Sequence, residues 1–305
     1  MKARPLAPER LEARSAEIGG GLTIRRALPN RHRRTVGAWC FLDHAGPMRF
    51  AAGGGMHVGP HPHIGLQTFT WMIEGEVVHR DSLGNEQVIT PGQVNLMTAG
   101  AGIAHAEDSA PGRAGGLHAA QLWIALPEGE RHRPPAFRNY PHLPLVESGG
   151  FSVRVLAGNA FGQSSPAEVY SPLVGLDLSA TGRATLRVPL EPSFEHAALV
   201  LSGAVTASGE ALSPGTLLCF APGHEELAVR CESAARLLLI GGTPFAEEIL
   251  VWWNFVARTR EEIEQAARDW NAGRRFGAVH GSPARPLVAP DVTGLNLRPA
   301  PPGAS

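Results

Sequence analysis

Residues 59–81 read GPHPHIGLQTFTWMIEGEVVHRD, and this stretch gives the first indication of the fold. His61 and His63 stand one residue apart, behind a Gly-Pro pair and ahead of an apolar run. If residues 61–73 form one strand, every second side chain shares a face with these histidines. That face comprises His61, His63, Gly65, Gln67, Phe69, Trp71 and Ile73. A face with histidines at one end and apolar residues at the other is typical of a small β-barrel that encloses a pocket.

A second pair of candidate ligands lies in TAGAGIAHAED (98–108), where His105 and Glu107 are also two residues apart. Two adjacent strands that each offer an i, i+2 pair to one interior can place four side chains around one point. Three imidazole nitrogens and one carboxylate oxygen suit iron, nickel, copper, manganese or zinc. We therefore predict one transition-metal ion per chain, with coordination positions left open for chemistry. Its ligands would be His61, His63, His105 and Glu107.

Short apolar runs that alternate with polar residues cover most of the chain, and 36 glycines and 26 prolines separate them. This pattern predicts an all-β protein. The segment EVVHRDSLGNEQVIT (76–90) predicts a hairpin, because Gly84 and Asn85 can adopt the positive φ of a tight turn. The other predicted strands are GAWCFLDH (37–44), LHAAQLWIALP (117–127), FSVRVLAG (151–158), LVGLDLS (173–179), ATLRVPL (184–190), AALVLSG (197–203) and ARLLLIGG (235–242).

The two halves of the chain repeat one another, which predicts two copies of one antiparallel barrel. Each half contains a glycine, a Pro-Gly turn and a closing glycine, with the same spacing from the turn to the closing glycine. These are Gly75, Pro91-Gly92 and Gly100 in the first half, and Gly203, Pro214-Gly215 and Gly223 in the second. We expect an N-terminal metal-binding barrel (1–140), a C-terminal barrel with a helix (141–280) and a proline-rich tail (281–305), with the linker near residues 127–144.

The repeat also predicts which residues of the second barrel replace the candidate ligands. Counted from Gly203 and Gly223, the equivalent positions are Pro189, Glu191, Ala228 and Arg230. These residues form no set of metal ligands, so we expect the metal only in the first barrel. His196 and His224 are isolated in the sequence, and we interpret them as structural or exposed.

One segment, TREEIEQAARDWNAG (259–273), predicts a helix. Thr259 can cap its N-terminus, Glu262 completes a capping box, and Gly273 can end the helix. Its apolar stripe, which must dock on a barrel, consists of Ile263, Ala266, Ala267 and Trp270. The tail from residue 281 has no periodic pattern and is expected to be either poorly ordered or a strap over the surface.

Composition excludes several classes of protein. The net charge of -1 and the pI near 6.9 give no reason to expect direct nucleic-acid binding. The densest basic group, within residues 25–34, is interpreted as a solvated hairpin. Three cysteines without CxxC spacing predict buried thiols rather than disulfides or a zinc knuckle. Neither a signal peptide nor a membrane span is indicated, so we expect a cytoplasmic protein.

The quoted motifs, taken together, resemble the pirins, a branch of the cupin superfamily, over residues 20–277. The segments that carry the resemblance are FLDHAGP (41–47), HVGPHPHIG (57–65), WMIEGEVVHRDSLGN (71–85), ITPGQVNLMTAGAGIAHAED (89–108), QLWIALP (121–127) and WWNFVARTREEIEQAARDW (252–270). The resemblance implies a bicupin of two tandem cupin-type jelly-roll barrels. It also implies one metal, usually iron, in the N-terminal barrel. The pirin ligand pattern falls on His61, His63, His105 and Glu107.

Two residues depart from the pirin pattern. Gln67 stands where most pirins carry glutamate, and Ile64 replaces a common arginine. Glutamine cannot act as a carboxylate base, so a proton released by a bound substrate would have to reach Glu107, a metal-bound hydroxide or water. We therefore assign Glu107 and Gln67 as the catalytic positions and expect weak activity.

Two functions are compatible with these residues. Some pirins are implied to be quercetin 2,3-dioxygenases, so the first hypothesis is a metal-dependent dioxygenase of quercetin-like flavonols or related phenols and enols. The second is a redox- or ligand-sensing regulatory protein that acts through a protein partner. Phe69, Trp71 and Met72 are close enough in sequence to line the pocket, although Phe69 and Trp71 equally suit the barrel core.

Overall fold

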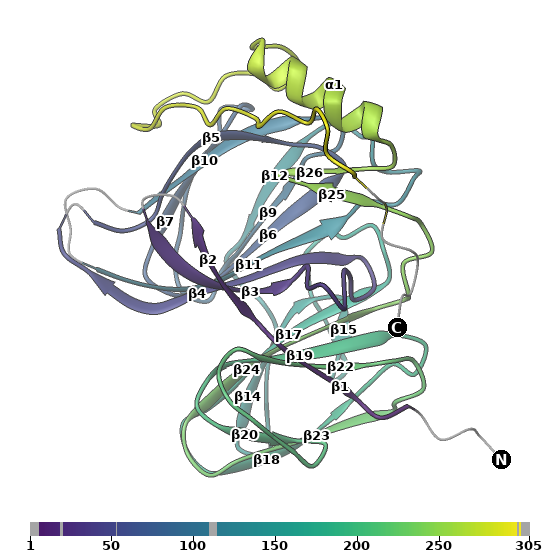
Figure 1. Ribbon diagram of the computed structural model, residues 1–305. Coiled ribbons are helices and arrows are strands. Elements are labelled where there is room, and N and C mark those ends of the chain that lie inside the picture. The colour runs from purple at the N-terminus through teal and green to yellow at the C-terminus, as the bar shows by residue number, and fades with distance from the viewer. Residues whose placement is uncertain (1–5, 19–20, 53, 110–114, 298, 300–305) are drawn as a thin grey trace.

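The strands of this protein form two antiparallel barrels, one stacked above the other (Figure 1). Each barrel consists of a seven-stranded and a four-stranded sheet. One helix, α1 (Arg260–Asn271), occurs in the part of the chain that is described. The predicted all-β class, with two tandem barrels and a short C-terminal helix, is confirmed. The computed structural model describes residues 6–18, 21–52, 54–109, 115–297 and 299.

The strands of the first barrel cover the segments predicted for this half of the chain, except that the single strand predicted over residues 61–73 is divided in two. They are β2 (Arg14–Ile18), β3 (Leu22–Leu28), β4 (Trp39–Phe50), β5 (His57–His63), β6 (Leu66–Glu74), β7 (Val77–Asp81), β8 (Glu86–Ile89), β9 (Val94–Thr98), β10 (Ile103–Ser109), β11 (Gly115–Ala125) and β12 (Ala136–Tyr140). The larger sheet has the order β12-β9-β6-β11-β4-β3-β2, and the smaller sheet the order β5-β10-β7-β8.

The second barrel repeats this arrangement of strands, except that the strand at one edge of its larger sheet comes from the start of the chain. Its strands are β1 (Glu9–Glu12), β13 (Leu145–Ser148), β14 (Phe151–Ala157), β17 (Leu173–Ala180), β18 (Ala184–Pro189), β19 (Glu195–Ser202), β20 (Val205–Ala207), β21 (Glu210–Leu212), β22 (Thr216–Phe220), β23 (Glu226–Cys231) and β24 (Ala235–Gly242). The sheet orders are β1-β22-β19-β24-β17-β14-β13 and β18-β23-β20-β21. A small hairpin, β15 (Asn159–Ala160) and β16 (Gln163–Ser164), lies outside both sheets.

Glycine is required for steric reasons at two equivalent positions of the sequence repeat. Gly75 and Gly203 follow the equivalent strands β6 and β19 and adopt φ of 88° and 73°. A Cβ atom would lie 2.0 Å from the carbonyl oxygen of Gly116 at the first position and 2.3 Å from that of Ala234 at the second. Each barrel therefore needs a residue without a side chain where this turn crosses the neighbouring strand.

The start of the chain lies in the second barrel, although residues 1–140 were expected to form the first. β1 pairs with β22, so the first strand of the chain completes the large sheet of the second barrel. The segment expected to be a linker contains β12, which pairs with β9 in the first barrel. Arg33, expected in a solvated hairpin, is instead buried and lies 3.4 Å from Glu195 of the second barrel.

The C-terminal segment returns to the first barrel. A hairpin of β25 (Leu250–Trp252) and β26 (Phe255–Ala257) precedes α1, which lies across the end of the first barrel near β5 and β10 (Figure 1). Thr259 caps α1 as predicted, its side chain accepting from the backbone N–H of Glu262. The apolar stripe of α1 packs with Ile64 and Ala104 of the first barrel.

The described part of the tail is a strap over the same end of the molecule, and residues 298 and 300–305 of the predicted tail lie outside the described residues. The Leu287 N–H donates to the Pro60 carbonyl at 2.8 Å. The Trp270 indole donates to the Leu287 carbonyl at 2.6 Å. These contacts fasten the strap both to β5 and to α1.

The two barrels share an apolar interface. Trp39 of β4 is fully buried there, and its indole N–H donates to the carbonyl oxygens of Val174 and Gly241 in the second barrel at 3.3 and 3.1 Å. Phe69 and Trp71 belong to the same cluster, so they are core residues. The three cysteines are buried free thiols, as predicted.

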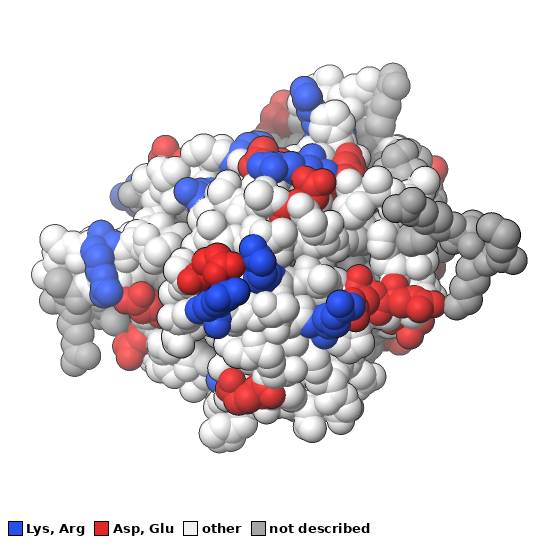
Figure 2. All heavy atoms as spheres, turned by 90° about the horizontal axis from the view of Figure 1, so that it is seen from below, with Lys and Arg blue, Asp and Glu red and all other residues white. Residues whose placement is uncertain are grey.

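Charges on the end of the molecule formed by the second barrel are mixed in sign (Figure 2). Arg187 and Glu226 pair at 2.7 Å there. No helix of the described ranges is long and apolar enough to cross a membrane.

Replacement of Gly203 by alanine should destabilise the protein through both backbone strain and a clash. Gly209 is a matched control, because its φ is 87° and no atom lies within 4 Å of the Cβ that alanine would add. Positive φ alone costs about 1–2 kcal/mol, so Gly209→Ala should lower the free energy of unfolding by that amount. Gly203→Ala should cost about 1–3 kcal/mol more. Denaturant unfolding measures both, and equal losses would contradict the steric explanation.

Candidate metal centre

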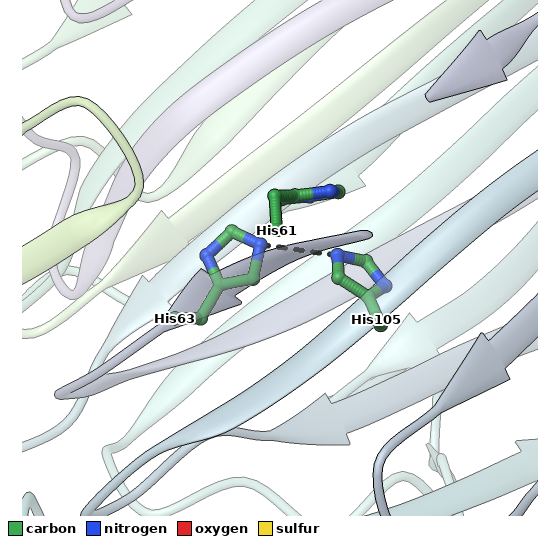
Figure 3. A group of neighbouring side chains, drawn as sticks. All are labelled: His61, His63 and His105. Atoms are coloured by element: carbon green, nitrogen blue, oxygen red, sulfur yellow. Dashed lines mark hydrogen bonds between the residues drawn. The ribbon is translucent and has the colours of Figure 1, made fainter. Parts of the chain in front are cut away.

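Three histidines converge inside the first barrel. His61 and His63 end β5, and His105 lies on the adjacent β10, where its Cα pairs with that of His61. The three rings point toward one another (Figure 3), with centroids 4.3 to 5.0 Å apart. All three side chains are buried. The structure thus brings together three of the four predicted ligands.

Backbone carbonyls orient two of these rings. Nδ1 of His61 lies 2.9 Å from the carbonyl oxygen of Gly59, and Nδ1 of His63 lies 2.9 Å from that of Asn254. A carbonyl oxygen only accepts, so each Nδ1 carries the proton and donates it. The Nε2 atoms of both rings therefore keep their lone pairs, which is the form that binds a metal.

The spacing of the nitrogens fits a metal. Nε2 of His63 and Nε2 of His105 are 3.0 Å apart (Figure 3, dashed line). At a metal–nitrogen distance of about 2.1 Å, two ligands at right angles stand about 3.0 Å apart. A cation between these nitrogens would relieve the repulsion of two facing lone pairs. This donor set can therefore hold a divalent transition metal.

Glu107 lies beside this group and shares His105 with it. The ligand atoms of His61, His63 and His105 lie within 4.8 Å of one another, and those of His79, His105 and Glu107 form a second such group. Glu107 is buried and faces His79 of β7 across the strand pair. Sequence reasoning missed His79. Its position on the inward parity of the predicted hairpin arm was the available signal.

Burial disfavours the charged forms of the side chains in this cluster. It lowers the pKa of His61 to about 4 and the pKa of both His63 and His105 well below 6.5. Burial also raises the pKa of Glu107 above its usual range. The physical cause in each case is that the charged form loses its hydration. The imidazoles are thus unprotonated at neutral pH and available as ligands.

Gln67 lies outside this group, and the expectation that it shares a face with the histidines is wrong. The predicted single strand over residues 61–73 is interrupted between β5 and β6, where Gly65 adopts a φ of 69°. β6 belongs to the other sheet. The Gln67 amide donates to the Thr98 hydroxyl and to the Glu168 carbonyl, both at 3.0 Å. The turn at Gly65 therefore reverses which parity of β6 faces the barrel interior.

A cavity of about 500 Å³ adjoins the cluster. Trp123 stands edge-on to His63, with centroids 5.2 Å apart, and stacks on Phe41 at 4.0 Å. Met72 also lines the cavity, whereas Phe69 and Trp71 do not. The cavity wall nearest the histidines is therefore aromatic and flat.

The wall continues from this aromatic pair to a charged pair. The Arg26 guanidinium lies 4.5 Å from the centre of the Phe41 ring. It donates to both carboxylate oxygens of Asp43, at 2.7 and 2.6 Å. Arg26 had been expected in a solvated hairpin, and only the pairing of β3 with β4 brings it into the cavity.

Residues from the C-terminal segment complete the cavity. Val251, Trp253, Asn254 and Leu287 all line it. Trp253 adopts a φ of 49°, an uncommon conformation for a large side chain, in the turn of the β25–β26 hairpin. This turn presents the Asn254 carbonyl to His63.

In the second barrel the positions equivalent to the ligands lie on the surface or at a strand end. Ala228 and Arg230 are exposed on β23, and Pro189 ends β18. His196 is buried, and His224 lies 2.9 Å from the Leu6 carbonyl. Both metal-capable groups found in the described residues are in the first barrel.

The chain is similar to known proteins over most of its length. The family model described as Pirin matches residues 21–124, and the one described as Pirin C-terminal cupin domain matches residues 175–277. A Pseudomonas aeruginosa protein named "Putative quercetin 2,3-dioxygenase PA1205" is 51% identical over 285 residues, covering 93% of this chain and 90% of that protein.

Two further proteins extend this similarity. A pirin-like protein of Caulobacter vibrioides is 39% identical over 270 residues, covering 86% of this chain and 92% of the relative. A crystal structure of a protein named quercetin 2,3-dioxygenase, from Acinetobacter baumannii, superposes with a TM-score of 0.93 at 48% identity. It covers 96% of this chain and 98% of the other.

Metal binding should stabilise the wild-type protein. A ligand present at 100 times its Kd adds about 2.7 kcal/mol to the free energy of unfolding. We expect this gain, with one metal per chain, for the wild type and no gain for His61→Ala/His105→Ala. Elemental analysis and thermal unfolding with and without metal measure these quantities. Two metals per wild-type chain, or full occupancy in the double variant, would contradict the single site.

Proposed function

The chain belongs to the pirin family of bicupins, and on that basis we propose that it is a metal-dependent dioxygenase of quercetin-like flavonols or related phenols and enols. The observation that carries this proposal is the histidine cluster at one end of a cavity with an aromatic wall. The relatives named as quercetin dioxygenases support the same substrate class.

We assign the metal ligands as His61, His63, His105 and Glu107. Iron is the metal that we propose, with nickel, copper, manganese and zinc as alternatives that the same donor set accepts. When bound, a redox-active metal supplies the electronic work of activating a chelating phenol or enol towards dioxygen. The protein contributes the orientation of the substrate and the exclusion of water.

Glu107 is the proposed acceptor of the substrate proton. Flavonol cleavage requires loss of a hydroxyl proton, and a positioned base typically contributes about 10²- to 10⁴-fold. Glu107 lines the cavity beside His105, so its carboxylate is placed to accept a proton from a substrate bound there. Gln67, the other position assigned from sequence, lies outside the cavity lining and is not proposed to contact substrate.

The remaining wall of the cavity suits a polyphenol. A flat ring can lie against Trp123 and Phe41, which are stacked within 13° of parallel. Beyond them, Asp43 offers acceptors and Arg26 offers donors for hydroxyl groups on a second ring. Flavonols carry hydroxyl groups on both ring systems, so they match an aromatic wall with polar groups at each end.

Turnover of a flavonol by the iron-loaded protein tests the proposed function. Flavonol loss and oxygen uptake should depend on the metal and should be abolished in His61→Ala. The assay should be run across pH and repeated with nickel, copper, manganese and zinc. Absence of metal-dependent turnover at every pH, including alkaline conditions where the flavonol is already ionised, would exclude the oxygenase. A regulatory role through a protein partner would then take its place.

Replacement of Gln67 by glutamate, the residue that most pirins carry at this position, should not raise activity. Gln67→Glu would place a carboxylate against the Glu168 carbonyl, which Gln67 contacts at 3.0 Å. The Thr98 hydroxyl can donate to the new carboxylate, but the Glu168 carbonyl only accepts, so the hydrogen bond to it is lost. This loss should lower the free energy of unfolding by about 1–3 kcal/mol and leave kcat unchanged.

Gln121→Glu is the matched control for this change. Gln121 lines the same cavity as the histidines, and its side-chain oxygen already accepts from Thr70 at 2.7 Å. A carboxylate there keeps that bond and adds charge beside the substrate, so it should shift the pH profile. A gain in kcat for Gln67→Glu would contradict the placement of residue 67 outside the cavity.

A further inference from the structure

Two buried polar side chains of β7, His79 and Asp81, lie next to the histidine cluster. Their exposed fractions are 3% and 2%. Nε2 of His79 lies 3.1 Å from Oδ2 of Asp81. Nδ1 of His79 lies 3.3 Å from Nδ1 of His105. The three side chains therefore form a continuous chain of contacts that ends at a proposed metal ligand.

Asp81 determines the direction in which hydrogen bonds are donated along this series of contacts. Both of its oxygens meet donors: the backbone N–H of Leu83 at 2.9 Å, the backbone N–H of Asn85 at 3.1 Å and the Asn85 amide at 2.9 and 3.0 Å. A carboxylate surrounded in this way only accepts hydrogen bonds. Asn85 does not adopt the positive φ expected of it. It serves instead as a double donor to Asp81.

Because Asp81 is an acceptor, it determines which ring nitrogen of His79 and of His105 carries the proton. Because Asp81 accepts, Nε2 of His79 carries a proton and donates it. In a neutral imidazole the other nitrogen is then an acceptor. Nδ1 of His79 therefore accepts, and Nδ1 of His105 donates to it. Nε2 of His105 is left with its lone pair, directed at Nε2 of His63, 3.0 Å away.

We propose that His79 and Asp81 are positioning residues that hold His105 in the tautomer and orientation required of a metal ligand. They provide the hydrogen-bond acceptor for His105 that backbone carbonyls provide for His61 and His63. His61 donates to the Gly59 carbonyl and His63 to the Asn254 carbonyl. His105 has His79 as its acceptor instead, so its orientation depends on side chains. This inference rests on the proposed metal site and not on the reaction carried out there.

The surroundings of His79 favour this role over direct ligation. One ring nitrogen faces Asp81 and the other faces His105, so neither is free to turn toward a metal. The ring also stacks on Phe137, with centroids 4.2 Å apart and planes within 8°. A second metal held by His79, His105 and Glu107 would require His79 to leave one of these partners.

Metal binding by variants of His79 tests the proposal. His79→Phe keeps a flat ring against Phe137 but removes the acceptor for His105. His79→Gln restores an acceptor oxygen, and Asp81→Asn weakens the anchor without altering His79. His196→Phe is the matched control, because His196 is a 1%-exposed histidine in the second barrel. Cobalt(II) serves as the probe, with its affinity measured by competition with a chelator and its stoichiometry by elemental analysis.

Loss of an outer hydrogen-bond partner typically lowers metal affinity about 10- to 100-fold. We expect that loss for His79→Phe, a smaller loss for Asp81→Asn, partial recovery for His79→Gln and no change for His196→Phe. In every variant the stoichiometry should stay at one metal per chain, and the cobalt absorption spectrum should indicate the same coordination number as in the wild type.

Three results would overturn the proposal. Wild-type affinity in His79→Phe would show that His105 needs no such support. Two metals in the wild type and one in His79→Phe would make His79 a ligand of a second site. A changed coordination number in the cobalt spectrum of His79→Phe would make it a direct ligand of the first. None of these measurements depends on turnover. They therefore test the role of His79 and Asp81 even if the protein proves not to be a dioxygenase.

Discussion

The hydrogen bond from His63 to the Asn254 carbonyl joins parts of the chain 191 residues apart. It orients a central ring of the histidine cluster, and it requires the C-terminal hairpin to return from beyond the second barrel. That return places Val251 and Trp253 in the cavity wall. It also lets α1 and the strap cover the end of the first barrel. The contact that orients His63 thus belongs to the same segment that closes the cavity.

The two barrels show how one topology can serve two purposes. The interior of the second barrel is filled by a continuous apolar cluster that includes Phe151, Leu186 and Phe220. The first barrel replaces such side chains with histidines, a carboxylate and open space. Buried polar groups cost free energy unless they are paired. In the first barrel, backbone carbonyls and the Asp81 side chain accept hydrogen bonds from the buried histidines and so offset this cost.

Much of the fold could be predicted because it rests on local signals. Alternation over a few residues located the strands, the hairpin around Gly84 was correct, and Thr259 caps the helix. The repeat of Gly75 and Gly203 predicted the duplicated barrel, because the same steric requirement recurs at both turns. The pairs His61/His63 and His105/Glu107 each lie on one strand, where two-residue spacing fixes a shared face.

The sequence by itself determined the strands, the repeat, the helix and the residue types of the candidate site. Only the tertiary structure decided that Gln67 faces away from the cluster, because the turn at Gly65 moves the chain into another sheet and resets its parity. Tertiary structure alone also brought in His79, Arg26 and Asn254. Alternation along β7 indicates that His79 faces inward, but its contact with His105 depends on which strands pair. The positions of Arg26 and Asn254 likewise depend on strand pairing and on where a distant hairpin docks, which alternation within one strand does not specify.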